Sequence, residues 1–324
     1  MKNLILAFLF LFHCRANQVY ADSLFHDTTN AAKTETTLFA PGAIPGPALI
    51  NAAPAFSPDG NTVYLGQTVK GKSLTIMMSQ NNAGQWSYPQ IGPFSGKYTD
   101  LEPAFAPNGK YIVFASNRPL SAGGPLLDGH YNGKTYTGRG GNLWKVDMTK
   151  NGNSQPHPLP SVINSNSSVF SPAVAGNGSL YFMRADDGGI FHIYYSQFRH
   201  GQYETPARPS FSDEASGEYD PAVAPDESFI IFSSKRPPAP NVTDLFIAFR
   251  TSGGWSAPID LRSVLSDKVF GVEARLSPDC KTLFFSNTTD MSGRKNPEEE
   301  YIWKVDLTTL LKAHGITKIP GTNK

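Results

Sequence analysis

One phrase recurs along this chain and constrains its fold more than any other feature. It reads "PAFAPNGKYIVFASNRP" over Pro103–Pro119 and "PAVAPDESFIIFSSKRP" over Pro221–Pro237. Weaker copies begin at Pro54, Pro172 and Ala274, and successive copies start 49, 69, 49 and 53 residues apart. Five copies at this spacing indicate one supersecondary unit that is repeated along the chain.

Each copy predicts a β-hairpin that is followed by two further strands. In Pro103–Pro119, "PNG" is a tight-turn signature, and the β-branched and aromatic run "KYIVFAS" follows it as a second strand. Apolar third strands begin at Leu74, Asn142, Phe191, Asp244 and Tyr301. A fourth strand is marked by an aromatic residue or a histidine three places before a proline, at Trp86, His157, Tyr203 and Trp255.

The fifth unit lacks a fourth strand, and the sequence "TTLFAPG" offers one at the other end of the chain. It places Leu38 three residues before Pro41, at the usual distance from the next phrase. Four-stranded units repeated in this way are typical of a β-propeller, in which radial repetition protects the sheet edges. We therefore expect an all-β propeller of five blades over residues 36–312, closed by the N-terminal strand, with a C-terminal tail over 313–324. A ring of six blades is the alternative.

The N-terminal residues predict export. The apolar run Leu4–Phe12 is too short to span a bilayer, and "VYA" at Val19–Ala21 resembles a signal-peptidase site. We expect a signal peptide over residues 1–21, a linker over 22–35, and a periplasmic or secreted protein. Lipid anchoring through Cys14 is the alternative, although the preceding "LFH" does not suit it.

Charge and cysteine content exclude several classes of partner. Lys and Arg number 28 against 27 Asp and Glu, so there is no basic excess to attract nucleic acid or an anionic membrane. Without the signal peptide, Cys280 is the one cysteine left, which excludes an internal disulfide. We expect a monomer with no membrane span, whose partner is a protein or a glycan.

The phrases "FSPDG", "FASNRP" and "FSSKRP", each followed by an aromatic third strand, resemble the WD-like repeats of TolB-type β-propellers from exported bacterial proteins. The resemblance covers nearly the whole mature chain. It implies a protein-binding module of a cell-envelope complex, although some relatives are polysaccharide lyases. This chain departs from the pattern at Glu227 and Cys280, which replace a turn glycine, and at Gly176, which replaces a proline. The first two place a side chain where the turn favours a positive φ.

Acidic residues precede the phrase in three units, at Glu102, Asp220 and Glu273. Asp100 and Glu218 lie two residues earlier, so a regular strand would place them on the same face. Because the first strand of a blade lies nearest the channel, we expect these carboxylates to crowd one channel mouth. A Ca²⁺ site built from the same oxygens is an alternative to their being paired with arginines.

Two arginines lie at a matching offset from these acids. Arg118 follows Glu102 by 16 residues, and Arg236 follows Asp220 by 16. A hairpin returns its second strand to the start of its first, so we expect each arginine to form a bidentate ion pair with a nearby acid. Glu273 has Asn287 at this position by the same reasoning, which makes it the least compensated acid.

An insertion over Pro119–Gly141 separates the second and third strands of the second blade. It carries four residues of types that are enriched in binding hot spots, namely His130, Tyr131, Tyr136 and Arg139. Such loops emerge on the face of the acidic mouth, whereas short turns of the "PDG" type on the opposite face leave little room for specificity. A flexible glycine-rich excursion without a partner is the alternative.

Signatures of catalysis are scarce. There is no G-x-S-x-G motif, and no histidine lies on a predicted first strand, where the lyase relatives would lead us to expect metal ligands. We therefore expect an exported, non-catalytic propeller without a cofactor or metal, which binds a protein or glycan of the cell envelope through one face of the ring. A carbohydrate-active lyase or hydrolase that uses the channel carboxylates is the alternative.

Overall fold

A computed structural model describes residues 34–39, 54–68, 74–149, 152–238, 243–266, 269–287 and 301–318. The chain divides into two units, Met1–Lys33 and Thr34–Lys324, and all described residues belong to the second. The predicted signal peptide with Cys14, most of the predicted linker and the end of the predicted tail lie outside them.

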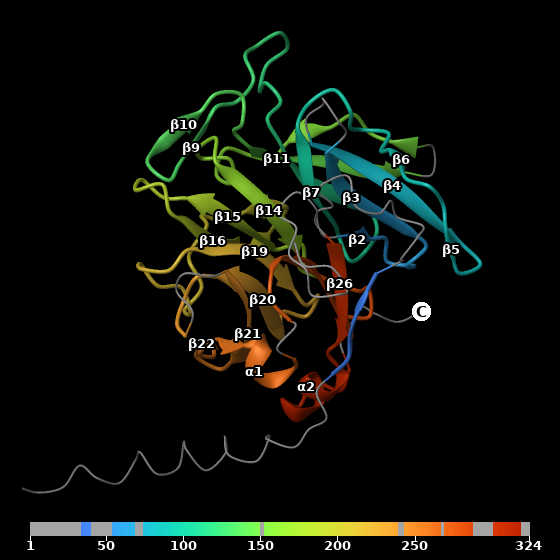
Figure 1. The fold of residues 1–324 in the computed structure, drawn as a ribbon. Helices are drawn as coiled ribbons and strands as arrows, with labels where there is room; N and C mark the ends of the chain where they lie inside the picture. Colours follow the sequence, from blue (N-terminus) through green and yellow to red (C-terminus); the bar gives the residue numbers. More distant parts are fainter. Residues whose placement is uncertain are drawn as a thin grey trace, which may run out of the picture. The chain divides into compact units, whose positions relative to one another are not determined.

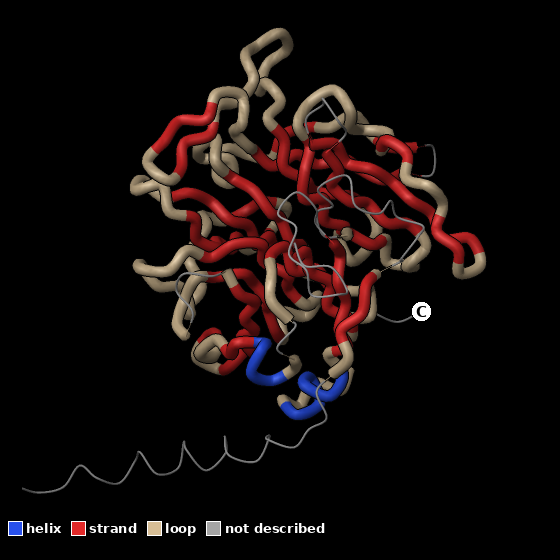
Figure 2. Tube along the Cα trace, viewed as in Figure 1, coloured by secondary structure: helices blue, strands red, loops and turns tan. Residues whose placement is uncertain are grey.

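The second unit is an all-β propeller of five blades, as the repeat predicts. Five antiparallel sheets follow one another around a ring, and β7, β14 and β19 lie near its centre (Figures 1 and 2). Each phrase forms the first two strands of one blade. The six-bladed alternative is therefore wrong.

The first two blades follow the predicted strand order, whereas the fourth strand predicted at Tyr203 does not join the sheet of blade three. Blade one contains β2 (Ala55–Phe56), β3 (Thr62–Thr68), β4 (Leu74–Asn82), β5 (Gln85–Trp86) and β6 (Gln90–Ile91). Blade two contains β7 (Asp100–Phe105), β8 (Tyr111–Ser116), β11 (Asn142–Thr149), β12 (Gly152–Asn153) and β13 (His157–Pro158). Blade three contains β14 (Val169–Val174), β15 (Leu180–Ala185) and β16 (Phe191–Ser196), with a small hairpin of β17 (Phe198–Arg199) and β18 (Gln202–Tyr203) beside them.

The last two blades carry the two short helices. Blade four contains β19 (Glu218–Val223), β20 (Phe229–Ser234), β21 (Asp244–Thr251), β22 (Gly254–Trp255) and β23 (Ile259–Asp260), followed by α1 (Leu261–Val264). Blade five contains β24 (Val272–Leu276), β25 (Thr282–Asn287) and β26 (Tyr301–Asp306), followed by α2 (Thr308–Ala313). The insertion of blade two forms β9 (Gly129–Tyr131) and β10 (Lys134–Tyr136).

Apolar side chains fill the spaces between adjacent blades. Tyr64 of blade one packs with Phe114 and Trp144 of blade two. Tyr181 of blade three packs in the same way with Phe232 of blade four. Each sheet is therefore covered on both faces by its neighbours, which explains why the first and second strands read as almost continuously apolar.

The turns between first and second strands require a residue with positive φ. Gly60, Gly109 and Gly178 supply it in the first three blades, with φ between 69° and 87°. Glu227 and Cys280 adopt the same conformation in the last two, with φ of 58° and 56°. A residue with a side chain is less stable than glycine in this left-handed conformation by about 1–2 kcal/mol. Contacts elsewhere must offset that strain.

The side chain of Glu227 makes such contacts. Its carboxylate accepts hydrogen bonds from Tyr181 Oη, from Asn177 Nδ2 at 3.1 Å and from Arg250 Nη2 at 3.3 Å. Two of these partners belong to blade three, so the turn residue that strains the backbone also links two blades. Cys280 is buried in the apolar core instead, and burial raises the pKa of its thiol to about 12.

The N-terminal strand closes the ring, as predicted. Strand β1 (Thr36–Leu38) pairs antiparallel with β26, with Thr36 opposite Val305 and Leu38 opposite Trp303. Phe39 continues the ladder by donating its N–H to Ile302 O at 2.9 Å. The ring is thus joined by hydrogen bonds between the two ends of the propeller.

Phe39 also seals the junction between the first and last blades. Its ring lies edge-on to Phe56 and Trp86 of blade one and to Phe284 of blade five, with centroids 5.1–5.9 Å away.

We expect Phe39→Ala to lower the free energy of unfolding by about 2–4 kcal/mol, since the contacts on both blades are lost. Urea denaturation measures this. Tyr88→Ala is the control, because Tyr88 is 75% exposed, and equal losses for the two variants would contradict a role in closure.

Candidate functional site

A β-bulge interrupts the inner strand of four blades at the same place. The register of β7, β14, β19 and β24 against their neighbours shifts just before the Pro-Ala pair or its counterpart. One residue in each bulge has a positive φ, namely Glu102 (53°), Ser171 (45°), Asp220 (52°) and Glu273 (59°). Bulges redirect side chains, and here they bring these four residues within hydrogen-bonding distance of one another along the channel.

Hydrogen bonds join the bulge residues from blade to blade. Glu102 Oε2 accepts the N–H of Ser171 at 2.7 Å, and Ser171 Oγ donates to Asp220 Oδ1 at 2.6 Å. Asp220 Oδ2 then accepts the N–H of Glu273 at 3.1 Å, and Ser286 Oγ donates to Glu273 Oε2 at 3.1 Å. The structure thus brings together all three predicted acids. Ser171, which the sequence analysis missed, connects two of them.

Crowding of these carboxyl groups changes their acid–base chemistry. Burial, and after it the neighbouring charge of Asp220, raise the pKa of Glu102 to about 7. The Ser171 N–H and the more distant Arg275 oppose this rise. Near neutral pH the Glu102–Asp220 pair therefore holds a proton that an isolated pair of carboxylates would release.

The predicted arginine pairs form, but with different acids. Arg118 donates from Nε to Asp100 Oδ1 at 3.2 Å and from Nη2 to Asp100 Oδ2 at 3.0 Å, and it does not pair with Glu102. The bulge is the reason, because it breaks the alternation that would place Asp100 and Glu102 on one face. Asp100 also accepts from Ser116 Oγ at 2.7 Å and from Ser95 Oγ at 2.8 Å.

Blade four has the corresponding ion pair, but a single guanidinium nitrogen makes it, so it is not bidentate as predicted. Arg236 Nη2 donates to Glu218 Oε1 at 3.0 Å rather than to Asp220, and Ser212 Oγ donates to Glu218 Oε2 at 2.7 Å. His192 Nδ1 lies 3.2 Å from Glu218 Oε2. Burial lowers the pKa of Arg236, although the charge of Glu218 opposes the shift. We call these two sets, centred on Asp100–Arg118 and Glu218–Arg236, the latches.

Asn287 is not the residue of blade five that corresponds to Arg118, and the alignment used for Glu273 is wrong by two residues. Arg275 pairs with Phe284 as Ala104 pairs with Val113, which aligns Asn287 with Ser116 and not with Arg118. Asn287 Nδ2 donates to Phe270 O at 2.9 Å. The residue that aligns with Arg118 is at position 289, outside the described residues. The inference that Glu273 is the least compensated acid therefore has no support.

The insertion is an ordered hairpin attached to blade three. His130 N donates to Ser168 Oγ at 2.8 Å, and Asn132 N donates to Gly189 O at 2.8 Å. The rings of Tyr131 and Tyr136 stack with centroids 4.4 Å apart. These contacts do not fit the alternative of a flexible excursion.

The four predicted binding residues of the insertion differ in exposure. His130 and Arg139 are exposed, with His130 Nδ1 3.1 Å from Thr135 Oγ1, and Tyr136 is half-buried. Tyr131 is also half-buried, and its ring contacts Phe170 and Phe191 of blade three. Tyr131 therefore supports the fold in addition to any role in binding.

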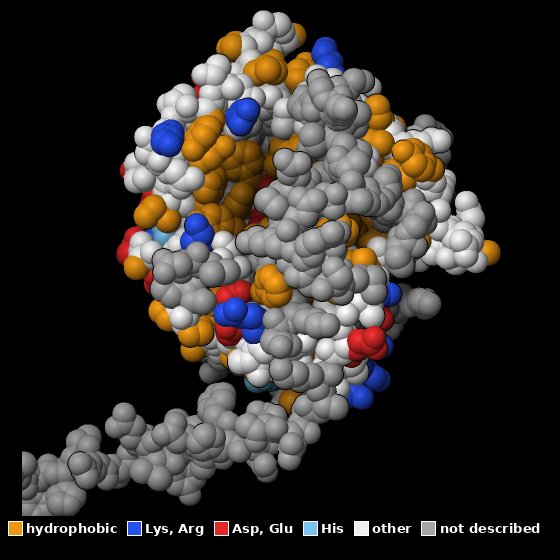
Figure 3. All heavy atoms as spheres, in the orientation of Figure 1, with side chains coloured by type: hydrophobic (Ala, Val, Ile, Leu, Met, Phe, Trp, Pro, Cys, Tyr) orange, Lys and Arg blue, Asp and Glu red, His pale blue; other side chains and the backbone are white. Residues whose placement is uncertain are grey.

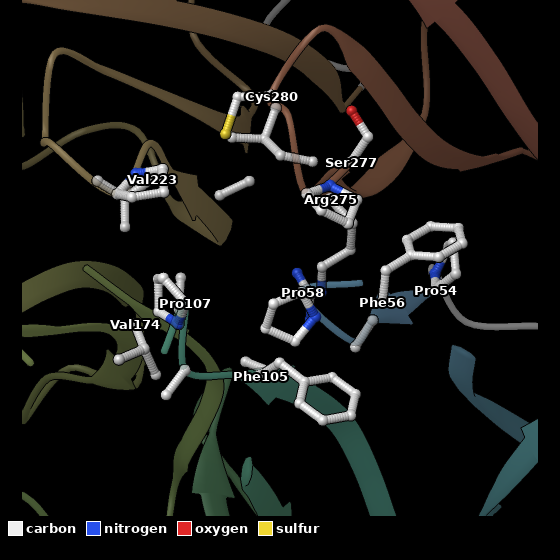
Figure 4. Close-up of a pocket in the computed structure, with 18 of the residues that line it drawn as sticks. Pro54, Phe56, Pro58, Phe105, Pro107, Val174, Val223, Arg275, Ser277 and Cys280 are labelled. Carbon is white, nitrogen blue, oxygen red and sulfur yellow. The ribbon is translucent and has the colours of Figure 1, made fainter. Parts of the chain in front are cut away.

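A cavity of about 730 Å³ occupies the channel on the side of the short turns. Alanines, prolines and Phe56 and Phe105 line it, with the turn residues Pro58 and Pro107 toward its mouth (Figure 4). From blade one to blade five, the order runs counterclockwise in Figure 1 and clockwise in Figure 4. The two figures therefore show opposite faces of the ring. The prediction that this face leaves little room for specificity is wrong, because the cavity has the size of a small-molecule site.

The described residues give no support to a metal centre or a membrane span. Within them, no group of three or more His, Cys, Asp or Glu side chains could hold a metal ion. No helix in the same part of the chain has the length and apolar character to cross a bilayer. The predicted Ca²⁺ alternative at the acidic mouth stays untested.

Comparisons with known proteins bear on the fold. No protein-family model and no curated protein matches the sequence. A thermostable family-43 glycoside hydrolase has a similar structure, with a TM-score of 0.51 and 13% identity over 82% of this chain and 91% of that chain. TolB from Acinetobacter baumannii gives 0.44 and 14% over 79% of this chain and 54% of that chain, so this chain spans about half of it. A gluconolactonase from Xanthomonas campestris gives 0.44 and 13%, over 86% and 95%.

The buried ion pairs of the two latches predict a large loss of stability when one of the two charges is removed. Arg118→Ala leaves Asp100 buried without its counter-charge, so we expect the free energy of unfolding to fall by about 3–5 kcal/mol. Arg199→Ala is the matched control, because the Arg199–Glu204 pair lies at the surface and contributes about 0–1 kcal/mol. Guanidinium denaturation of both variants gives the difference. A loss below about 1 kcal/mol for Arg118→Ala would show that the latch is dispensable.

The raised pKa of Glu102 predicts a dependence of stability on pH. Its ordinary value is 4.5 and its value in the fold is about 7, so between these pH values the folded chain holds a proton that the unfolded chain has released. Stability from this group is therefore present below pH 4.5 and lost as the pH rises to about 7. Relative to the native chain, Glu102→Gln should gain up to about 3 kcal/mol between pH 4.5 and pH 8. Urea titrations at both pH values test this, and a constant difference would contradict it.

Proposed function

We propose that this chain is an exported, non-catalytic β-propeller that binds a protein or glycan of the cell envelope through the face that carries the insertion. The observation that supports it most is the β9–β10 hairpin, which is fixed to blade three and so presents a preformed surface. A rigid loop loses little conformational freedom when a partner binds.

Apolar side chains are exposed on and beside this hairpin. Leu120 and Leu126 of the insertion are 59% and 47% exposed, and Ile190 of the neighbouring loop is 39% exposed. Figure 3 shows hydrophobic side chains gathered over β9 and β14, with lysine or arginine side chains around them. Exposed apolar residues with a charged rim are typical of protein interaction sites. We define Leu120, Leu126 and Ile190 as the insertion patch.

The bonding of the channel acids favours binding over catalysis. Glu102 and Asp220 both accept hydrogen bonds from the bulge of the next blade. A catalytic carboxyl group must instead reach a substrate proton with its free oxygen. In this proposal the acids therefore stabilise the ring. The signal-like N-terminal sequence supports an envelope location.

A lyase or hydrolase is the second candidate, and one observation favours it. Glu102 lies beside Asp220 and has a pKa of about 7, and a carboxyl group that holds its proton near neutral pH is suited to general acid–base catalysis. Turnover of an acidic polysaccharide that disappears in Glu102→Gln would replace the binding proposal with this one.

Capture from envelope extracts tests the binding proposal. We expect Leu126→Asp together with Ile190→Asp to abolish retention of the partner, because two charges are placed in an apolar interface, while thermal stability changes little. Tyr88→Asp is the control, since Tyr88 is exposed in blade one, away from β9 and β10 (Figure 1). Mass spectrometry or glycan analysis identifies what the native chain retains. Equal retention by the patch variant and the control would contradict the proposal.

A further inference from the structure

The channel cavity on the turn side has no role in the proposed function. Its walls come from the inner strands of all five blades and the first turns of four, and most of the lining residues are prolines and alanines. Cys280 also lines it, and its raised pKa keeps the thiol neutral. Such walls suit an apolar ligand body rather than a hydrated ion.

One position of the cavity breaks the five-fold pattern. Four blades place an alanine directly after the bulge proline, and these residues are Ala55, Ala104, Ala173 and Ala222. Blade five places Arg275 there, and all five residues line the cavity. Figure 4 shows the Arg275 side chain reaching from its strand into the cavity toward Pro58. The alanines leave the space that this side chain enters.

The guanidinium of Arg275 is buried and incompletely bonded. The residue is 7% exposed, and its Nη1 donates to Ala274 O at 2.8 Å. Its Nε has no hydrogen-bond partner among the described residues, and no ion pair of Arg275 is found there. An uncompensated buried charge is costly, so this arrangement calls for an anionic partner.

The acids of the channel do not fill that role. Glu102 is close enough for Arg275 to lower its pKa, yet burial and Asp220 together raise it to about 7. The Asp220 carboxylate accepts hydrogen bonds from Ser171 Oγ and from the Glu273 N–H, and the Glu273 carboxylate accepts one from Ser286 Oγ. The acidic residue that lines the cavity itself is Asp59, which is exposed at the turn and bonded to Ser57 and Asn61.

We propose that this cavity binds a small organic monocarboxylate with an apolar, ring-containing body, whose carboxylate pairs with Arg275. The planar fork of a guanidinium matches the two oxygens of a carboxylate. The proline rings and the side chains of Val174 and Val223 contact the body of the ligand. The cavity volume of about 730 Å³ lies within the range of small-molecule sites.

The charge count favours a carboxylate over a phosphate ester. Among the residues that the structure describes, Arg275 is the one Lys or Arg that lines the cavity. A monoanion is neutralised by this single cation, whereas a dianion would leave one charge uncompensated among apolar walls. A neutral analogue of the same shape would leave Arg275 unpaired.

Isothermal titration of the full mature chain with three probes tests the proposal. The probes are 3-phenylpropanoate, its neutral amide 3-phenylpropanamide and 2-phenylethyl phosphate. We expect the carboxylate to bind at least about ten-fold more tightly than the amide, as a charge-assisted bidentate pair allows. The phosphate should bind more weakly than the carboxylate. Equal affinity for acid and amide, or no binding of the acid at millimolar concentration, would overturn the proposal.

The variant Arg275→Ala restores the alanine that the other four blades use, so the inner strand remains compatible with the fold. It should remove the preference for the acid over the amide, while Arg199→Ala should keep it. The acid should raise the Tm of the native chain and not that of Arg275→Ala. Without ligand, Arg275→Ala should have an equal or higher Tm, and a clearly lower Tm would assign Arg275 to the fold instead.

Discussion

The ring depends on hydrogen bonds between the bulges of its inner strands. Four bulges each turn one residue into a left-handed conformation, and in three of them the side chain of that residue bonds the bulge of the next blade, as Glu102 bonds Ser171 and Asp220 bonds Glu273. The conformational cost is offset because a backbone N–H that leaves its own sheet is satisfied by the neighbouring blade. Packing between sheets fills the space between blades, and these bonds link the inner strands of adjacent blades at the channel.

The latches perform a different task within single blades. Asp100 and Glu218 are fully buried, and each joins the start of an inner strand to an arginine at the end of the second strand. Arg118 Nη2 also reaches Phe94 O at 2.7 Å, so the segment that enters the blade is fixed as well. Acids two residues apart thus serve two purposes, one within the blade and one between blades.

The repeat made most of the fold predictable, and local geometry limited what could be predicted of the site. Hairpin and third-strand patterns depend on short-range chemistry, so the five blades and the closing strand could be read from the sequence. The partners of Arg118 and Arg236 could not, since a bulge shifts side chains from one face to the other without a clear signature. Ser171 and Arg275 were both visible in an alignment of the five copies, as a serine among acids and an arginine among alanines.

Closure of the ring by β1 also constrains how the chain folds. Thr36 must pair with Val305, so the first strand of the propeller stays unpaired until the last blade has been made. Contacts of such large sequence separation slow folding and leave intermediates open to association. The unpaired strand is only three residues long. It therefore offers only a short edge with which a strand of another chain could pair. Ring closure is thus a docking of the two ends of the propeller, which lie far apart in the sequence, and it joins the five blades into a single cooperative unit.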